Sequence, residues 1–208
     1  FQNEEQVEGS AQRESAKPGD IRFKDLNSDD VLDEQDRTKI GDPWPDFVYG
    51  LSLGATWKGF DFNVFFQGSQ GNDVLNMTLR DFESGTGTMN AREGFLNRAW
   101  NGEGSTDKYH RISAEQGQNS EISDYFVEDG SYLRLKNLQL GYNFCERLLK
   151  IKGISYLRLY VSAQNLFTLT KYSGLDPEIG SSNATLNGID QGFYPQARTW
   201  TVGLNIKF

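Results

Sequence analysis

The end of the chain alternates apolar and polar residues without interruption. From Trp200 to Phe208 every second residue is apolar, and the intervening residues are Thr201, Gly203, Asn205 and Lys207. Because successive side chains of a β-strand point to opposite faces, this segment has one apolar and one polar face. A soluble protein would bury the apolar face in a core, whereas a strand of a transmembrane barrel would turn it to lipid. The pattern therefore predicts a strand but leaves its surroundings open.

Four earlier segments carry the same two-residue period. An alternating run that begins at Phe47 stops at Lys58-Gly59, and a second run follows directly, so the two predict a hairpin with a tight turn. In the third segment the apolar residues change parity between Leu135 and Leu138. This change predicts a β-bulge near Lys136-Asn137, or an upper part of the strand that stands clear of lipid. The expected strands cover about 47–58, 60–68, 131–144, 154–167 and 198–208.

The connections between these strands alternate in length. The hairpin turn and the connection 145–153 are short, whereas residues 1–46, 68–130 and 170–195 form long, mostly polar segments. Bacterial outer-membrane barrels show this alternation because their periplasmic turns are short and their extracellular loops are long. We therefore expect an all-β fold, a transmembrane antiparallel β-barrel, with the three long segments outside the cell. The alternative is a soluble calcium-binding β-sandwich that acts as an adhesion or scaffolding module.

Composition agrees with a barrel and excludes several classes of protein. The mean hydropathy of −0.62 resembles that of a soluble protein, but a barrel strand needs only every second residue to be apolar. No run approaches the roughly 20 apolar residues of a transmembrane helix. The net charge of −8 argues against nucleic acid as a partner. With one cysteine, Cys145, one histidine, His110, and no arrangement of nucleophile and base, we expect no catalytic residues and no enzyme.

The number of expected strands is too small for a closed membrane barrel. Bacterial barrels have at least about eight strands, because an open sheet edge in hydrocarbon leaves backbone groups unpaired. We therefore expect partner strands from a missing segment or from another chain. The start at Phe1, without an initiator Met or a signal peptide, predicts an internal or processed beginning.

A series of motifs follows in order along nearly the whole chain. The most specific are LRLYVSAQNLFT at 157–168 and KYSGLDPE at 171–178. The others are KPGDIRFKDLN at 17–27, DFVYGL at 46–51, FFQG at 65–68, GND at 71–73, GSYLRLKN at 130–137, LGY at 140–142, YP at 194–195 with Arg198, and the final strand 203–208. In these motifs the sequence resembles the C-terminal end of the SusC/RagA family of TonB-dependent outer-membrane transporters from Bacteroidetes.

The resemblance implies that the complete protein is a much larger transporter. It implies a barrel of about 22 strands, of which this chain would supply about the last five. A plug domain and a contact with the TonB–ExbB–ExbD complex would come from the missing N-terminal region. The extracellular loops would contact a SusD-like surface lipoprotein, and the cargo would be an oligosaccharide or a peptide. The location would be the outer membrane of a Gram-negative, Bacteroidetes-like cell, with Phe208 as the signal for barrel insertion.

One acidic segment, 25–36, has the oxygen spacing of an EF-hand calcium loop. Position six is Asp30, where an EF-hand has Gly, and the twelfth position is Asp instead of the longer Glu, so both departures weaken binding. No long amphipathic helices flank the segment. It predicts either a site for Ca²⁺ or a solvated acidic loop held by Arg22, Lys24 and Arg37. The candidate ligands are Asp25, Asn27, Asp29, Val31 through its carbonyl, Asp33 and Asp36.

Polar residues on the inner parity of the strands form a second set of candidates. In a barrel their side chains would face the lumen, where they would meet a polar substrate, hydrogen-bond the plug, or solvate the channel wall. Apart from calcium in the acidic loop, this function requires no cofactor. The lumen-facing candidates are Asn63, Gln67, Arg158, Tyr160 and Gln164.

Overall fold

The computed structural model describes residues 1–83, 90–113, 117–144, 153–180 and 184–208; the predicted short connection at 145–153 falls almost wholly outside these residues. The chain forms two compact units. The predicted division into a loop region, 1–46, and a strand region, 47–208, differs from them because parts of the two later loops join the N-terminal residues. The first unit is Phe1–Gly41, Leu75–Val127 and Ile189–Gly192, and the second is Asp42–Val74, Glu128–Gly188 and Phe193–Phe208.

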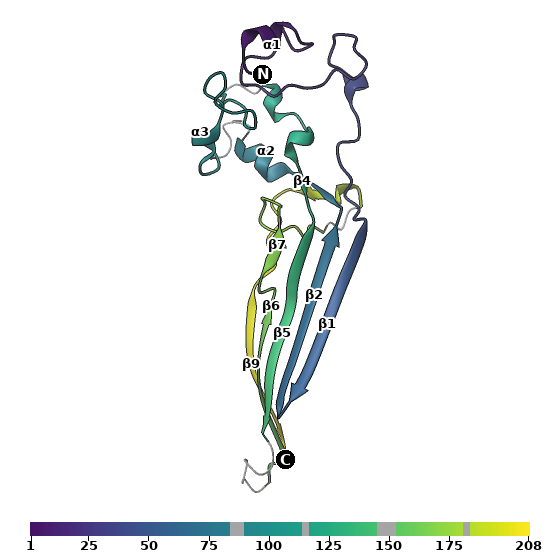
Figure 1. Cartoon of the computed structure of the whole chain (residues 1–208), viewed down its shortest axis with the longest axis vertical. Helices are drawn as coiled ribbons and strands as arrows, with labels where there is room; N and C mark the ends of the chain where they lie inside the picture. The colour runs from purple at the N-terminus through teal and green to yellow at the C-terminus, as the bar shows by residue number, and fades with distance from the viewer. Residues whose placement is uncertain (84–89, 114–116, 145–152, 181–183) are drawn as a thin grey trace. The chain divides into compact units, whose positions relative to one another are not determined.

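The second unit is built on one antiparallel sheet (Figure 1). Its strands are β1 (Phe47–Trp57), β2 (Phe60–Gln70), β5 (Tyr132–Phe144), β6 (Tyr156–Gln164), β7 (Thr168–Thr170) and β9 (Thr199–Lys207). The order β1-β2-β5-β6-β9 makes β1 and β9 the two edges, and β7 pairs with β5. The five long strands lie within a few residues of the predicted ranges, since a two-residue period is a strong local signal for a half-buried strand.

The predicted bulge in β5 is confirmed. Phe65 pairs with Asn137 and the next residue, Phe66, pairs with Leu135, so Lys136 has no partner in β2. A single extra residue reverses the parity of a strand. The bulge therefore brings the apolar residues on both sides of Lys136 to the same face of the sheet, although their spacing in the sequence would place them on opposite faces.

A two-residue turn, Lys58-Gly59, joins β1 to β2. Both residues have positive φ, 48° for Lys58 and 91° for Gly59. This combination is the one that a type I′ turn requires, and such turns match the twist of an antiparallel hairpin. A Cβ on Gly59 would lie 2.9 Å from the carbonyl oxygen of Asn143, so the turn needs glycine for space as well as for conformation.

The first unit consists mainly of short helices. No helix among the described residues is long and apolar enough to cross a membrane. β3 (Asp73–Asn76) and β8 (Ile189–Asp190) run parallel, and with β4 (Val127–Asp129) they form a small sheet of order β4-β3-β8. The helices are α1 (Glu4–Glu8), α2 (Met77–Glu83) and α3 (Phe95–Arg98), with the 3-10 turns η1 (Glu34–Asp36), η2 (Gln118–Ser120) and η3 (Asp124–Phe126); a further turn, η4 (Ala184–Leu186), lies in the second unit.

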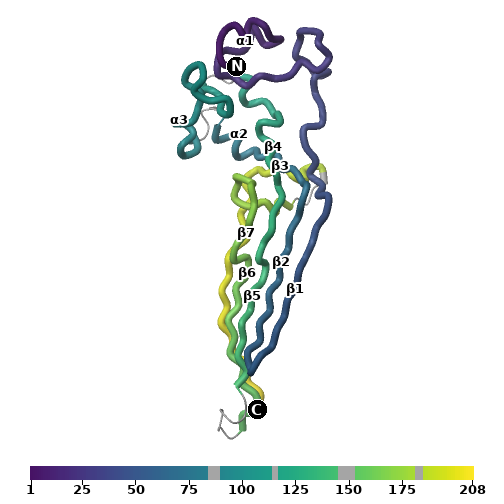
Figure 2. Tube along the Cα trace, viewed as in Figure 1, coloured from purple at the N-terminus to yellow at the C-terminus, as the bar shows by residue number. Residues whose placement is uncertain are grey.

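Distant segments of the chain meet in the first unit, as the purple and teal parts of the tube in Figure 2 show. The Asp20 carboxylate accepts hydrogen bonds from Asn119 Nδ2 at 2.8 Å and from Arg111 Nε at 2.6 Å. Phe95 and Phe126 are 2 % and 0 % exposed. The long loops therefore have a core of their own, which the strand periodicity did not predict.

Candidate functional site

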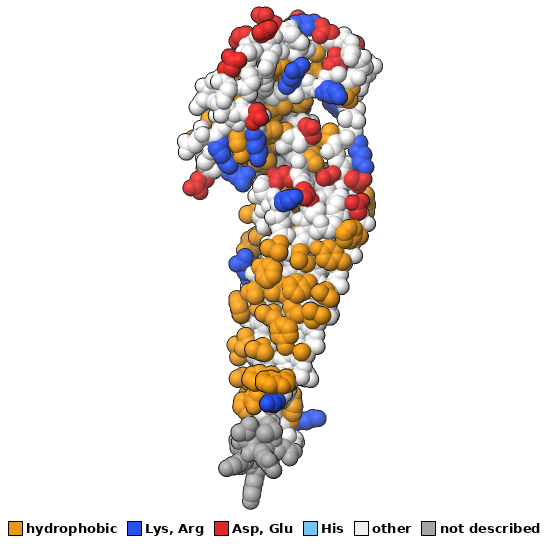
Figure 3. All heavy atoms as spheres, viewed as in Figure 1, with side chains coloured by type: hydrophobic (Ala, Val, Ile, Leu, Met, Phe, Trp, Pro, Cys, Tyr) orange, Lys and Arg blue, Asp and Glu red, His pale blue; other side chains and the backbone are white. Residues whose placement is uncertain are grey.

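One face of the large sheet carries rows of apolar side chains that continue from strand to strand. In an antiparallel sheet the residues directly opposite each other share a face, so a row keeps its character only if every strand has the right parity. Figure 3 shows apolar side chains, in orange, gathered over the strands. Three complete rows are Trp57, Phe60, Tyr142, Leu159 and Leu204; Ala55, Phe62, Leu140, Val161 and Val202; and Leu53, Val64, Leu138, Ala163 and Trp200.

The rows that alternate with them belong to the opposite, inner face and are mostly polar or glycine. Among the residues of these rows, Phe65 has an apolar side chain, and Tyr160 has an aromatic ring with a polar hydroxyl. Polar and apolar rows thus alternate through all five long strands, which is the pattern of a sheet between water and lipid. The inner rows are Thr56, Asp61, Gly141, Tyr160 and Gly203; Gly54, Asn63, Gln139, Ser162 and Thr201; and Ser52, Phe65, Asn137, Gln164 and Thr199.

Most of the apolar face is exposed. Phe62, Leu159 and Val202 are 38 %, 43 % and 72 % exposed, whereas Val64 and Ala163, in the row of Leu138, are 7 % and 2 % exposed. We expected a continuous band of exposed apolar side chains that includes Tyr49, but its ring is half-buried where it covers Gly68. A β-sandwich would bury this face against a second sheet. The sandwich alternative is therefore wrong for the described residues, and the exposed face has the character of a membrane-contacting surface.

On the inner face, Arg158 is held in an ion pair. Its guanidinium extends from β6 across β5 to Asp61 in β2, with Nε 2.9 Å from Oδ1 and Nη2 2.5 Å from Oδ2. Gly141 lies between them, and a Cβ there would meet Asp61 Oδ1 at 2.5 Å. Two parallel bonds fix the orientation of both side chains. The sequence indicated Arg158 as a lumen residue but did not indicate Asp61. The signal that could have found Asp61 is Gly141, a glycine on the inner face of β5, between neighbouring strands that carry opposite charges on that face.

The other predicted lumen residues also lie on the inner face. Tyr160 joins the ion pair, since the Arg158 guanidinium carbon lies 4.9 Å from the centre of its ring. The amides are separate from this cluster: Asn63 and Gln164 are exposed and in different rows, and Gln67 is half-buried. The structure therefore gathers two of the five candidates, and their contact with a substrate stays a prediction.

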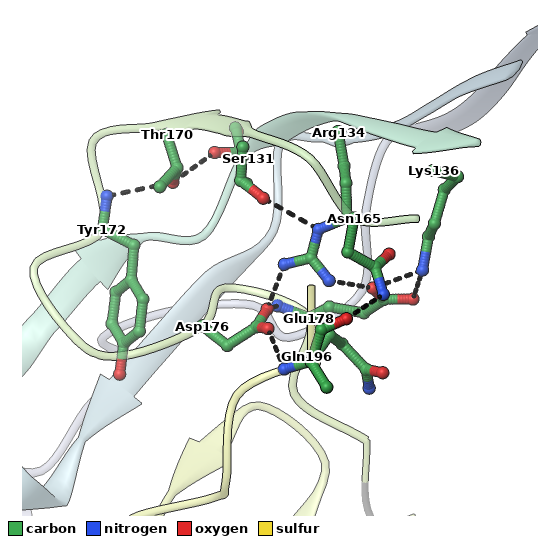
Figure 4. Close-up of polar contacts among 11 residues, drawn as sticks. Ser131, Arg134, Lys136, Asn165, Thr170, Tyr172, Asp176, Glu178 and Gln196 are labelled. Atoms are coloured by element: carbon green, nitrogen blue, oxygen red, sulfur yellow. Dashed lines mark hydrogen bonds and ion pairs between the residues drawn. The ribbon is translucent and has the colours of Figure 1, made fainter. Parts of the chain in front are cut away.

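A second cluster of charges lies toward the opposite end of the inner face (Figure 4). Arg134, which is 2 % exposed, donates to Thr168 Oγ1 at 2.9 Å, to Glu178 Oε2 at 2.7 Å, and to Asp176 Oδ1. Lys136 Nζ lies 2.8 Å and 2.6 Å from the two oxygens of Glu178. Sequence reasoning missed this cluster, because its carboxylates lie 42 and 44 residues beyond Arg134, in a loop without periodicity.

The cluster keeps Asp176 ionised. Burial acts to raise the pKa of Asp176, but hydrogen bonds from the Gln196 N–H, the Arg134 guanidinium and the Glu178 N–H outweigh it, so the pKa lies below its ordinary value. The two N–H groups are 2.9 Å from Oδ2 and Oδ1, respectively. Both carboxylate oxygens of Asp176 are thus occupied by donors from this chain.

The acidic loop has part of the backbone geometry of a calcium loop. Asp25, at position one, accepts the N–H groups of Ser28 at 2.6 Å and Asp30 at 2.8 Å. Asp30 has a φ of 67°, the left-handed conformation for which an EF-hand uses Gly at position six. The carboxylate of Asp36 accepts the N–H groups of Leu26 and Asp33 at 2.7 Å and 3.0 Å.

These bonds direct the predicted ligand oxygens to the loop's own backbone. Asp29 and Asp33 accept N–H groups two residues ahead, at 3.0 Å and 2.7 Å. Among the residues that the structure describes, no group of three or more His, Cys, Asp or Glu is placed to hold a metal ion. Among the described residues, Arg13 is a basic partner of the loop, with its Nη2 2.6 Å from Asp30 Oδ2. Calcium binding by this loop stays a prediction, and it requires the side chains to turn from the backbone toward the ion.

Phe208 follows the edge strand β9 and is 90 % exposed. An exposed terminal aromatic side chain is accessible to another protein, as a recognition signal must be. Its function in insertion stays a prediction.

Comparison with known proteins gives consistent matches. No family model matches the chain. TonB-dependent receptor P3 of Formosa agariphila is 42 % identical over 197 residues, which cover 92 % of this chain and 19 % of that protein. TonB-dependent receptor SusC of Bacteroides thetaiotaomicron is 34 % identical over 204 residues, covering 94 % of this chain and 18 % of SusC.

Solved structures agree with these relatives. A structure of the RagAB peptide transporter matches with a TM-score of 0.67 and 30 % identity over 80 % of this chain and 17 % of the matched chain. The closed-closed state of the RagAB peptide importer matches with a TM-score of 0.66 and the same identity. The chain spans about a fifth of the length of the curated relatives it matches. Its sequence motifs, its sheet and these matches together show that the chain is a segment of a TonB-dependent receptor of the SusC/RagA family.

Proposed function

We propose that this chain is part of the wall of a closed outer-membrane barrel through which nutrients are imported. The observation that carries the proposal is the alternation of apolar and polar rows across all five long strands, with most of the apolar side chains exposed. A transmembrane barrel needs this arrangement because its outer face contacts lipid and its lumen contacts water.

The two edges of the sheet support closure by further strands. Within the described residues β1 and β9 each have one strand neighbour in this sheet. Unpaired backbone groups in hydrocarbon cost several kcal/mol each, so both edges need partners in a membrane. We propose that the remaining strands complete a barrel of about 22 strands, of which this chain supplies about the last five.

The proposed orientation and partners follow from the same barrel. The long connections 1–46, 68–130 and 170–195 would lie outside the cell, and the turn Lys58-Gly59 would lie in the periplasm. We further propose a SusD-like lipoprotein at the extracellular side, energisation by TonB–ExbB–ExbD through the remainder of the protein, and an oligosaccharide or a peptide as cargo. Relatives named SusC and RagAB peptide importer support this proposal.

The test uses the complete protein that contains this sequence, produced with its native lipoprotein partner. Uptake of labelled oligosaccharides and of labelled peptides is measured in cells with and without TonB. The proposal predicts TonB-dependent uptake of one of these two cargo classes, and membrane fractionation should recover the protein with the outer membrane. Recovery of the protein in a detergent-free soluble fraction would refute the proposal.

A further inference from the structure

Hydrogen bonds and ion pairs hold the segment Lys171–Glu178 near its start and at its end. Just before it, Thr170 Oγ1 donates to the carbonyl oxygen of Ser131 at 2.8 Å. Ser173 donates to Glu128 through both its N–H and its hydroxyl, each at 2.7 Å. The Arg134 ion pairs hold the segment's other end. Residues far apart in sequence therefore fix this loop at three successive points.

The attachment lies on the inner face of the sheet. Arg134 pairs with Gln67 in β2, and Gln67 has the same parity as Asn63 and Asp61 in the polar rows. Because Arg134 points to that face, the carboxylates of Asp176 and Glu178 must approach it from the same side (Figure 4). The segment consequently covers part of the inner face, near the end of the strands that carries the long connections.

The cluster has the properties of an anchor rather than of a ligand site. The side chains of Arg134 and Asp176 are 3 % and 8 % exposed, and Glu178 binds Lys136 as well as Arg134. Removal of one partner from a buried, hydrogen-bonded ion pair leaves the other charge without compensation, which makes such a pair costly to open. Leu175, in the middle of the segment, is nevertheless 72 % exposed. The buried ion pairs thus hold a loop whose middle residue, Leu175, is exposed.

We propose that Lys171–Glu178 is a fixed, inward-folded loop that narrows the outer mouth of the import pathway, with Arg134 as its positioning residue. This inference depends on the proposed barrel, because only in a closed barrel does the inner face enclose a pathway. The loop restricts passage without binding the cargo through its charges, since those charges are used within the cluster.

The experiment measures the position of the loop and the passage of solutes separately, in the complete protein. For the position, spin labels are attached at Leu175→Cys and Asn63→Cys in a Cys145→Ser background, and pulsed EPR gives their distance distribution. For the passage, TonB-dependent uptake of a small and a large cargo is compared in cells that carry each variant, because a plug domain would stop passive entry into liposomes. The variants are Arg134→Gln on the sheet, the pair Asp176→Asn and Glu178→Gln on the loop, and Arg134→Lys; Glu121→Gln, at an exposed carboxylate, is the control.

The expected result is a narrow distance distribution in the parent and the control, and a broad one in Arg134→Gln and in the loop double variant. In those two variants the ratio of large-cargo to small-cargo uptake should rise severalfold. Arg134→Lys should fall between these variants and the parent. Heat-dependent mobility on SDS gels shows that the barrel itself is folded in each variant. If Arg134→Gln and the loop double variant left the distance distribution unchanged, or broadened it without changing the ratio of large-cargo to small-cargo uptake, the inference would be overturned. Neither outcome affects the proposed importer, which requires only that uptake in the parent depends on TonB.

Discussion

The strongest quantitative prediction concerns an arginine placed on the outer face. Successive apolar rows cross this face of the sheet. In order, they contain Ile206, Leu204, Val202, Trp200, Leu135 and Leu133. Successive rows are two residues apart, so with strands tilted by about 40° the band is about 26 Å tall. Val161 lies in the third row from Ile206, close to the middle of the band.

Val161→Arg should therefore place a charge near the centre of the bilayer. At that depth an arginine on the lipid face of a barrel costs about 2–4 kcal/mol. The neighbouring variant, Ser162→Arg, adds the same side chain to the same strand, but on the inner face, and should cost less than about 1 kcal/mol because the lumen is aqueous. The assay is reversible urea unfolding of the complete protein in liposomes, followed by tryptophan fluorescence.

The comparison between these two adjacent residues is the decisive part. Both variants add the same side chain and the same charge to β6. Because the loss of the β-branched Val161 accounts for at most about 1 kcal/mol, a larger difference between their unfolding free energies reports the environment of each face. Equal losses, or a larger loss for Ser162→Arg, would refute the assignment of the apolar face to lipid.

Three further predictions test single features. Gly141→Ala should destabilise the barrel by about 1–3 kcal/mol, because the new Cβ displaces the Asp61–Arg158 pair; Gly180→Ala, where a Cβ meets nothing within 4 Å, is the control in urea titrations, and equal losses would contradict the reasoning. The anchor at Asp176 should weaken in acid. Its folded pKa is lowered, so its stabilisation is complete above the ordinary value of 3.8 and is lost as the pH falls through the lower folded value; the Leu175–Asn63 label distance should therefore stay narrow at neutral pH and broaden only below about pH 4, and broadening at pH 6 would count against it. Calcium should bind the loop 25–36 with saturable heat in calorimetry that Asp25→Asn abolishes, and a featureless titration would remove the site.

The sequence was informative where a local period determines the structure. The alternation at Trp200 to Phe208 fixes which side chains share a face once the segment is a strand, and the parity change between Leu135 and Leu138 predicted the bulge at Lys136. These features depend on residues within one or two strand lengths of each other.

The clusters of charges could not be predicted in this way. Asp61 and Arg158 are 97 residues apart, and Asp176 reaches Arg134 from a loop whose path has no period. The same reason explains why the N-terminal residues, expected as a separate loop region, belong to one compact unit with the described part of residues 75–127. Contacts of this kind depend on the closure of long loops, for which the pattern of apolar and polar positions carries no signal.

The most direct test of the central claim is the accessibility of β9 in the membrane. A nitroxide label is placed in turn at each residue from Thr199 to Lys207 of the complete protein in liposomes. Its collision rate is then measured with oxygen, which concentrates in lipid, and with a polar nickel complex, which stays in water. We predict that the ratio alternates with a period of two, with Trp200, Val202, Leu204 and Ile206 contacting lipid. A ratio without this period, or lipid contact at Thr201, Gly203 and Asn205 instead, would contradict the membrane-wall account.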